Sequence, residues 1–336
     1  MGAAVTFCDP HQNLQSSTAY RSSHGHVTEE IEGLIRVHKD GRVERFPVVP
    51  EVPCTWTPEP DVVCGDAVLD RSTRVWARFH VPKRPARRPL LIYFHGGGFS
   101  VGSAAWACYH RFLARVASQA GCVVMSVSYR LAPEHRLPAA FDDGVAAVKW
   151  AKQQASSGAD ECSGWWRGRC DFSQVFLGGD SAGAAVAHHV AARLGGHGLR
   201  GVVLIQPFFG GEERTASERA LGQQHGSVLS MAASDTYWRL ALPVGAKRDH
   251  PWCNPLQAGG GVEDPRLPAA LVFAAEMDIL RDRNVEVCRA MRRAGRRVEC
   301  VVHSGVGHAF QVLNTSPIAQ EQTQDMIAHI KAFMNR

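Results

Sequence analysis

The chain has 336 residues, of which 45% are hydrophobic and 21% charged, and this composition is typical of a folded globular protein with a large core. The net charge of +5 is small for this length. The arginine-rich stretches 83–88 and 292–297 are typical of a solvated loop and a helix end, so we expect no nucleic-acid partner. No apolar run is long enough to span a bilayer, so we expect no membrane insertion.

The ten cysteines are scattered singly, with no C-x-x-C pair, and the first thirty residues contain no secretory apolar segment. This usage predicts free thiols in a reducing compartment, which means the cytoplasm and also the nucleus. The first residues, Met1–Thr6, fit the N-myristoylation pattern. Because that pattern is short and permissive, it does not predict a lipid anchor by itself.

In chain order, residues 1–30 are largely polar and are predicted to form a mobile N-terminal segment. Apolar residues at 27, 31, 34 and 35 indicate a short helix, and a hairpin is expected next, with strands at 35–38 and 43–46 around an Asp-Gly turn. The proline-rich stretch 47–60 predicts an extended connector. Edge strands are expected at 62–63 and 75–81.

From residue 90 onward, predicted strands alternate with predicted helices. The strands are expected at 90–94, 122–129, 175–177, 202–205, 271–275 and 298–303. The helices are expected at 105–119, 139–154, 182–194, 231–242, 282–294 and 318–334. Such alternation predicts an α/β fold in one domain over 31–336, with a mostly parallel sheet covered by helices on both faces. The stretch 156–170 is expected to be a loop.

Ser181 lies in Gly179-Asp180-Ser181-Ala182-Gly183, directly after an apolar strand and before an alanine-rich helix. This is the G-x-S-x-G nucleophile elbow in the context that it requires. The glycines allow strand and helix to approach closely while the turn exposes the serine hydroxyl. Ser181 is therefore the predicted nucleophile.

An upstream strand runs into His95-Gly96-Gly97-Gly98-Phe99. Successive glycines leave backbone N–H groups unshielded, and such donors can stabilise the negative oxygen that forms when a carbonyl is attacked. The N–H of Ala182, at the start of the helix after Ser181, is expected to add a further donor. The alternative is a glycine-rich loop that only turns a corner, which an elbow serine downstream disfavours.

A serine nucleophile needs a histidine base, and the base needs an acid that orients it. After a nucleophile elbow, the acid comes first in the chain and the histidine follows. Asp278 follows the strand 271–275, and His308 follows the strand 298–303 between small residues. Glu276 and Asp282 are alternatives for the acid. Asp278 is preferred because Glu276 is close enough to the strand to face the core and Asp282 is placed to cap a helix.

Together these motifs resemble those of the plant carboxylesterases in the hormone-sensitive-lipase-like group of α/β-hydrolases. The resemblance runs from about residue 31 to the C-terminus and also includes Tyr129-Arg130-Leu131-Ala132-Pro133-Glu134. It implies an α/β-hydrolase fold, a triad of Ser181, Asp278 and His308, and oxyanion donors at Gly97, Gly98 and Ala182. It also implies that the N-terminal segment packs over the pocket as part of a lid.

The activity that this resemblance implies is hydrolysis of a small to medium apolar carboxylic ester by a serine carboxylesterase. The same group contains gibberellin receptors that have lost the histidine, whereas His308 is present here. Two alternatives remain: a hormone-binding or hormone-inactivating hydrolase acting on a lactone or conjugate, and a lyase or dehydratase using the same site.

The substrate pocket is expected to have apolar, aromatic walls, because an ester with apolar groups needs them. The residues predicted to contact substrate are Phe99, Tyr129, Asp180, Trp238 and Phe310, and further aromatic candidates are Trp106, Tyr109, Phe208 and Phe209. No metal and no organic cofactor is expected, because water and the triad suffice for the reaction.

Overall fold

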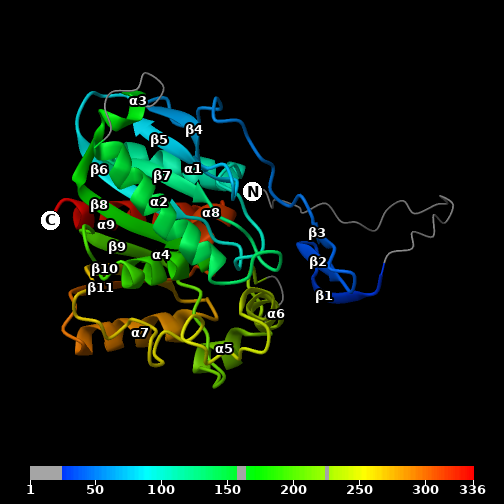
Figure 1. The fold of residues 1–336 in the computed structure, drawn as a ribbon. Coiled ribbons are helices and arrows are strands. Elements are labelled where there is room, and N and C mark those ends of the chain that lie inside the picture. The colour runs from blue at the N-terminus through cyan, green and yellow to red at the C-terminus, as the bar shows by residue number, and fades with distance from the viewer. Residues whose placement is uncertain (1–24, 157–163, 224–226) are drawn as a thin grey trace, which may run out of the picture.

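The computed structural model describes residues 25–156, 164–223 and 227–336 (Figure 1). The first 24 residues, which make up most of the predicted N-terminal segment and lid, lie outside this range. The described chain forms a large sheet of eight strands and a small sheet of three, in the orders β11-β10-β9-β8-β6-β7-β5-β4 and β1-β2-β3.

Six neighbouring strands of the large sheet are parallel, and the β4–β5 hairpin closes one edge in the antiparallel sense. Because helices cover both faces, the central strands are buried along most of their length and read as continuous apolar runs. The strands are β4 (Val62–Asp70), β5 (Val75–Pro82), β6 (Arg88–Phe94), β7 (Val123–Ser128), β8 (Cys170–Asp180), β9 (Gly201–Ile205), β10 (Ala269–Ala275) and β11 (Val298–His303).

The helices divide into two layers, one on each face of the sheet (Figure 1). One apolar cluster contains buried residues of α2 (Ala139–Ser156), α4 (Ala182–Arg193) and α7 (Arg281–Arg293). The other contains buried residues of α1 (Ala107–Val116) and α9 (Pro317–Met334), together with a π-helical turn, Ala117–Gly121. The predicted α/β class, with a mostly parallel sheet between two helical layers, is confirmed.

The helix predicted at 27–35 is wrong. The small sheet occupies this region, with β1 (Val27–Ile31), β2 (Ile35–His38) and β3 (Val43–Arg45), of which the predicted hairpin supplies β2 and β3. Gly33 lies at the turn between the first two strands with φ +70°, a left-handed conformation that a continuous helix does not contain. Ile31 pairs directly with Ile35 across that turn.

The small sheet lies beside α6 (Met231–Ala241) at the edge of the molecule (Figure 1). The Arg45 guanidinium of β3 donates to the backbone oxygens of Ser100 and Ala132 and pairs with both carboxylate oxygens of Glu134, at 2.6 and 2.7 Å. Arg239 of α6 pairs with Glu29 of β1. These contacts attach the small sheet to the loops that follow β6 and β7 and to α6.

Three short helices were not predicted: α3 (Gly164–Arg167), α5 (Ala216–Leu221) and α8 (Phe310–Leu313). Helix α3 lies in the stretch 156–170 that was expected to be a loop, and β8 begins at residue 170, the last of that stretch. A signal for α5 is present in the sequence, because Thr215 and Glu218 form a capping box at its start. Among the helices that the structure describes, none is both long and apolar enough to cross a bilayer.

The packing of α2 on α4 gives a stability prediction. A Cβ added at Gly144 of α2 would lie 2.5 Å from Val190 Cγ2 of α4. We expect Gly144→Ala to lower the free energy of unfolding by about 1–3 kcal/mol, because two packed helices have to separate to admit the methyl group. Gly164→Ala is the matched control, since none of the described residues lies within 4 Å of its added Cβ. Denaturant unfolding of both variants measures the difference, and equal stabilities would contradict the prediction.

Candidate active site

The turn between β8 and α4 places Ser181 at the carboxyl end of the sheet. Ser181 has φ 51°, a strained conformation for a residue with a side chain. Its N–H donates to the Ile205 carbonyl oxygen at 2.8 Å, which holds the turn against the next strand. A Cβ at Gly183 would lie 1.9 Å from the Phe94 carbonyl oxygen, so helix and strand approach this closely only with glycine there.

Asp278, His308 and Ser181 form a continuous hydrogen-bonded chain. His308 Nε2 lies 2.9 Å from Ser181 Oγ, and His308 Nδ1 lies 2.7 Å from Asp278 Oδ2. The other carboxylate oxygen of Asp278 accepts the N–H of Leu280 at 3.0 Å, which fixes the carboxylate. All three side chains are buried. The structure therefore brings together the three residues predicted as a triad.

The two alternatives for the acid have other partners. Glu276 accepts the N–H of Gly305 and is exposed, so it does not face the core. Asp282 does not cap its own helix. It accepts the N–H of Ser217 at the start of α5 and pairs with Arg281.

Electrostatics favour a proton on His308. Burial alone lowers the pKa of this imidazole, but the charge and hydrogen bond of Asp278, with a smaller contribution from the charge of Asp180, outweigh burial and place the pKa above the ordinary value of 6.5. A carboxyl oxygen accepts only, so His308 Nδ1 carries the proton and Nε2 presents its lone pair to the Ser181 hydroxyl. This arrangement can remove a proton from the serine and hold it on the imidazole.

The glycine loop lies beside Ser181. Gly97 and Gly98 have φ +106° and +58°, and an added Cβ would lie 2.1 Å from the Val101 carbonyl oxygen and 2.2 Å from the Tyr237 ring, respectively. The N–H groups of Gly97, Gly98 and Ala182 donate no hydrogen bond to any of the described residues. Gly97 and Gly98 line the same cavity as Ser181. The N–H groups of Gly97 and Gly98 are therefore available to an oxygen bound there, whereas Ala182 is buried behind Ser181 and is not among the lining residues.

Asp180 was predicted to contact substrate, but its main contacts are hydrogen bonds that fix the glycine loop. Although it lines the cavity, its buried carboxylate accepts hydrogen bonds from the Tyr93 and Tyr109 hydroxyls, each at 2.9 Å, and from the Gly96 N–H at 3.1 Å. Burial raises its pKa to about 6, and the donors and nearby His308 oppose that rise only in part. Asp180 thus links the turn that carries the serine to the glycine loop.

Ser181 and His308 open into a cavity of about 450 Å³, within the range of ligand pockets. Its wall is mainly apolar. Three of its aromatic residues, Trp106, Tyr109 and Phe208, were among the wider set of candidates. Of the described residues that line the cavity, none is a lysine or arginine, so the cavity is suited to an uncharged ligand.

Four of the five predicted substrate contacts need correction, because Phe99, Tyr129, Trp238 and Phe310 do not line this cavity. Phe99 and Trp238 pack against one another and against Phe208 in the core. Tyr129 stacks on His95 and donates its hydroxyl proton to the His95 carbonyl oxygen at 2.7 Å, which supports the glycine loop from behind. Phe310 packs against His303.

Other residues that line the cavity were not predicted, and they come from segments outside the sequence motifs. Leu34, Val48 and Val49 contribute from the small sheet and the connector that follows it, and Val228, Leu229 and Tyr237 contribute from α6 and the segment before it. Val48 and Val228 are half exposed and form an apolar mouth. Tyr237 occupies the place expected of Trp238, because adjacent residues on a helix point about 100° apart and only one of them faces the cavity.

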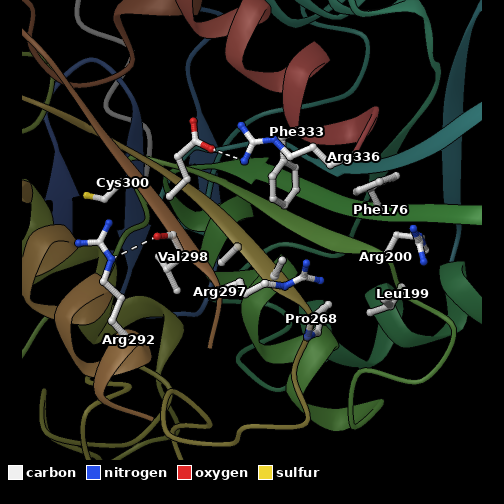
Figure 2. Close-up of a pocket in the computed structure, with 13 residues that line it drawn as sticks. Phe176, Leu199, Arg200, Pro268, Arg292, Arg297, Val298, Cys300, Phe333 and Arg336 are labelled. Carbon is white, nitrogen blue, oxygen red and sulfur yellow. Dashed lines mark hydrogen bonds and ion pairs between the residues drawn. The ribbon is translucent and has the colours of Figure 1, made fainter. Parts of the chain in front are cut away.

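A larger cavity, of about 740 Å³, lies at the opposite end of the sheet (Figure 2). Its residues come from the amino ends of β10 and β11, from the segment before β9 and from the end of α9. Arg200, Arg292, Arg297 and Arg336 surround it, and Arg336 pairs with Glu299. Because Ser181, Asp278 and His308 all follow the carboxyl ends of parallel strands, this cavity is not part of their site.

The Asp180 network gives a second stability prediction. The Tyr109 hydroxyl accepts the Gly96 N–H at 2.8 Å and donates to Asp180. Tyr109→Phe leaves both buried groups with one partner fewer, and we expect it to cost about 1–3 kcal/mol of stability. Tyr237→Phe is the control, since the Tyr237 hydroxyl makes no hydrogen bond to the described residues. Thermal unfolding of both variants checks this, and an unchanged midpoint for Tyr109→Phe would refute it.

Comparisons with known proteins agree with this geometry. A family model described as the alpha/beta hydrolase fold matches residues 91–312. The chain is 46% identical over 322 residues to "Probable carboxylesterase 6" of Arabidopsis thaliana, covering 93% of each chain. It is 34% identical to "2-hydroxyisoflavanone dehydratase" of Glycyrrhiza echinata, over 96% of this chain and 100% of that one.

Among solved structures, a Pyrobaculum calidifontis esterase superposes with a TM-score of 0.70 at 29% identity, over 82% of this chain and 86% of that one. The match with the family model covers more than half of the chain, and it includes the glycine loop, Ser181, Asp278 and His308. The chain therefore belongs to the α/β-hydrolase-fold family and, as its motifs indicate, to the plant carboxylesterase group within it.

Proposed function

We propose that this protein is a serine carboxylesterase that hydrolyses a small to medium apolar carboxylic ester through an acyl-enzyme. The observation that carries the proposal is the hydrogen-bonded chain from Asp278 through His308 to Ser181 at an apolar cavity. The high identity to a probable carboxylesterase supports it. An uncharged ester fits a wall without lysine or arginine and a volume of about 450 Å³.

In the first half of the reaction, His308 Nε2 takes the hydroxyl proton of Ser181 as Oγ attacks the ester carbonyl. The N–H groups of Gly97, Gly98 and Ala182 stabilise the resulting oxyanion, and each such donor contributes about 10²–10³ in rate. The protonated imidazole then gives its proton to the departing alcohol, leaving the acyl group on Ser181. Asp278 keeps the proton on Nδ1 and stabilises the imidazolium.

In the second half, water replaces the alcohol. His308 removes a proton from water as its oxygen attacks the acyl-enzyme, and the same N–H donors stabilise the second oxyanion. Collapse releases the carboxylic acid and returns the proton to Ser181. The site thus needs no group beyond those of the chain and a water molecule.

The first test of this function is Ser181→Ala with p-nitrophenyl butyrate as substrate. We expect turnover to fall by at least about 10³, because no other group can carry the acyl chain. A fluorophosphonate probe is expected to label the wild type and not the variant. Ser126→Ala is the control, since Ser126 is equally buried but lies in the middle of β7. Equal turnover by wild type and Ser181→Ala would contradict the assignment.

The second test uses pH. The reaction needs neutral His308, so kcat/KM is expected to rise with pH through a pKa above 6.5 and then level off. In Asp278→Asn, burial continues to lower the pKa of His308, while the larger opposing contribution, that of Asp278, is lost and only the smaller one from Asp180 remains. The acid limb of the profile therefore moves to lower pH, and the plateau falls by about 10³–10⁴. An acid limb that stays in place would show that another group controls the rate.

A lyase is the second candidate, and the 34% identity to a dehydratase over the full chain favours considering it. In that reaction the N–H donors would polarise a carbonyl while His308 removes a proton from the adjacent carbon. Product mass separates the two reactions, because hydrolysis adds one water to the substrate and elimination removes one. A hormone-binding protein, in contrast, would bind its ligand without turnover that depends on Ser181.

We further infer that the protein works in the cytoplasm on a small-molecule ester. The support for this compartment is that eight cysteines of the described chain are free thiols, several of them buried, as is usual in a reducing environment.

A further inference from the structure

Cys64, His80 and His110 form a cluster that the proposed reaction does not use. Cys64 of β4 and His80 of β5 are directly opposite each other in the antiparallel register, and His110 lies on α1. One ligand atom from each side chain lies within 4.8 Å of the other two. Both histidines are buried and Cys64 is half buried.

The hydrogen bonds of this cluster leave nitrogen lone pairs facing it. His80 Nδ1 lies 3.3 Å from the Cys64 sulfur, while His80 Nε2 has no partner among the described residues. A thiol is a weak hydrogen-bonding group and compensates poorly for the burial of an imidazole. His110 Nε2 lies 2.6 Å from the Trp56 carbonyl oxygen, which only accepts, so Nε2 carries the proton and Nδ1 the lone pair.

We propose that Cys64 Sγ, His80 Nδ1 and His110 Nδ1 bind Zn²⁺, with water as the fourth ligand. The ligand types are those that zinc prefers, and the bond from His110 Nε2 to a backbone carbonyl is the usual outer support of a zinc-bound histidine. Tetrahedral zinc places a sulfur and a nitrogen ligand about 3.5 Å apart, close to the observed 3.3 Å between Cys64 and His80. His110 is held within 4.8 Å of the other two ligands, and it completes the site by moving toward them.

Arg78 is the group that opposes this site. Its Nη1 lies 3.4 Å from His110 Nδ1, and zinc takes over that lone pair. Arg78 nevertheless keeps three stronger contacts, to both carboxylate oxygens of Asp66 at 2.8 and 2.9 Å and to the Val52 carbonyl oxygen at 2.8 Å. Asp66 balances the charge of Arg78. On binding, the Cys64 thiol releases its proton to solvent, and the thiolate offsets one of the two charges of the ion.

Zinc titration of the full-length, chelator-treated protein tests the proposal, with a chromophoric chelator as competitor. We expect the wild type to bind one equivalent and Cys64→Ser to bind at least about tenfold more weakly. Cys300→Ser is the matched control, because Cys300 is also half buried but lies on β11, away from these histidines, and it is expected to bind like the wild type. Equal affinity of the wild type and Cys64→Ser would overturn the proposal.

A second measurement uses the absorption spectrum of bound Co²⁺. Co²⁺ added in place of zinc is expected to give the near-ultraviolet charge-transfer absorption of a cobalt–thiolate bond in the wild type. A wild-type spectrum without that absorption would also overturn the proposal.

Thermal unfolding of the zinc-titrated proteins gives a third measurement. One equivalent of zinc is expected to raise the thermal midpoint of the wild type and of Cys300→Ser, but not of Cys64→Ser. An equal rise in all three proteins would place the ion elsewhere.

Discussion

The contact between the start of α4 and the end of β6 is the constraint on which the site depends. With a glycine at 183, the helix begins directly against the Phe94 carbonyl oxygen, at a distance that no side chain permits. Ser181 makes its strained turn directly before this contact, and the start of α4 lies against Phe94 and His95, where the glycine loop begins. The close packing of Gly183 on Phe94 therefore positions both Ser181 and the start of the glycine loop.

Two buried carboxylates near Ser181 have different partners and so behave differently. Asp278 faces an imidazole and a backbone N–H, and it raises the pKa of His308. Asp180 faces two tyrosine hydroxyls and the Gly96 N–H, and burial raises its own pKa to about 6. The first carboxylate can stabilise a cation during a reaction. The second holds loops in place, which explains why a polar residue next to the nucleophile need not touch a ligand.

The sequence predicted the large sheet and the residues at its carboxyl edge because alternating apolar segments and glycine motifs are local signals. It failed in the N-terminal segment and at the wall of the cavity. The spacing of apolar residues around Gly33 suits a helix, but pairing of Ile31 with Ile35 makes a strand. The aromatic side chains of Phe99 and Trp238 were expected at the cavity, yet they fill the core behind it. Gly33 is the local signal against the helix, whereas the burial of Phe99 and Trp238 depends on packing that no short window of residues reveals.

The hydrogen bonds that Arg45 makes with Glu134 and two backbone oxygens attach the small sheet to the large one. This attachment has a consequence for how the ligand preference of such a protein can change. The wall residues Leu34, Val48 and Val49 precede β4, the first strand of the large sheet, whereas Ser181, Asp278 and His308 lie far downstream in the chain. Replacements at these wall positions can change the shape of the cavity while the hydrogen-bonded chain from Asp278 to Ser181 stays intact. Recognition and chemistry are thus separable parts of one gene product, and relatives that share a triad are free to differ in what they accept.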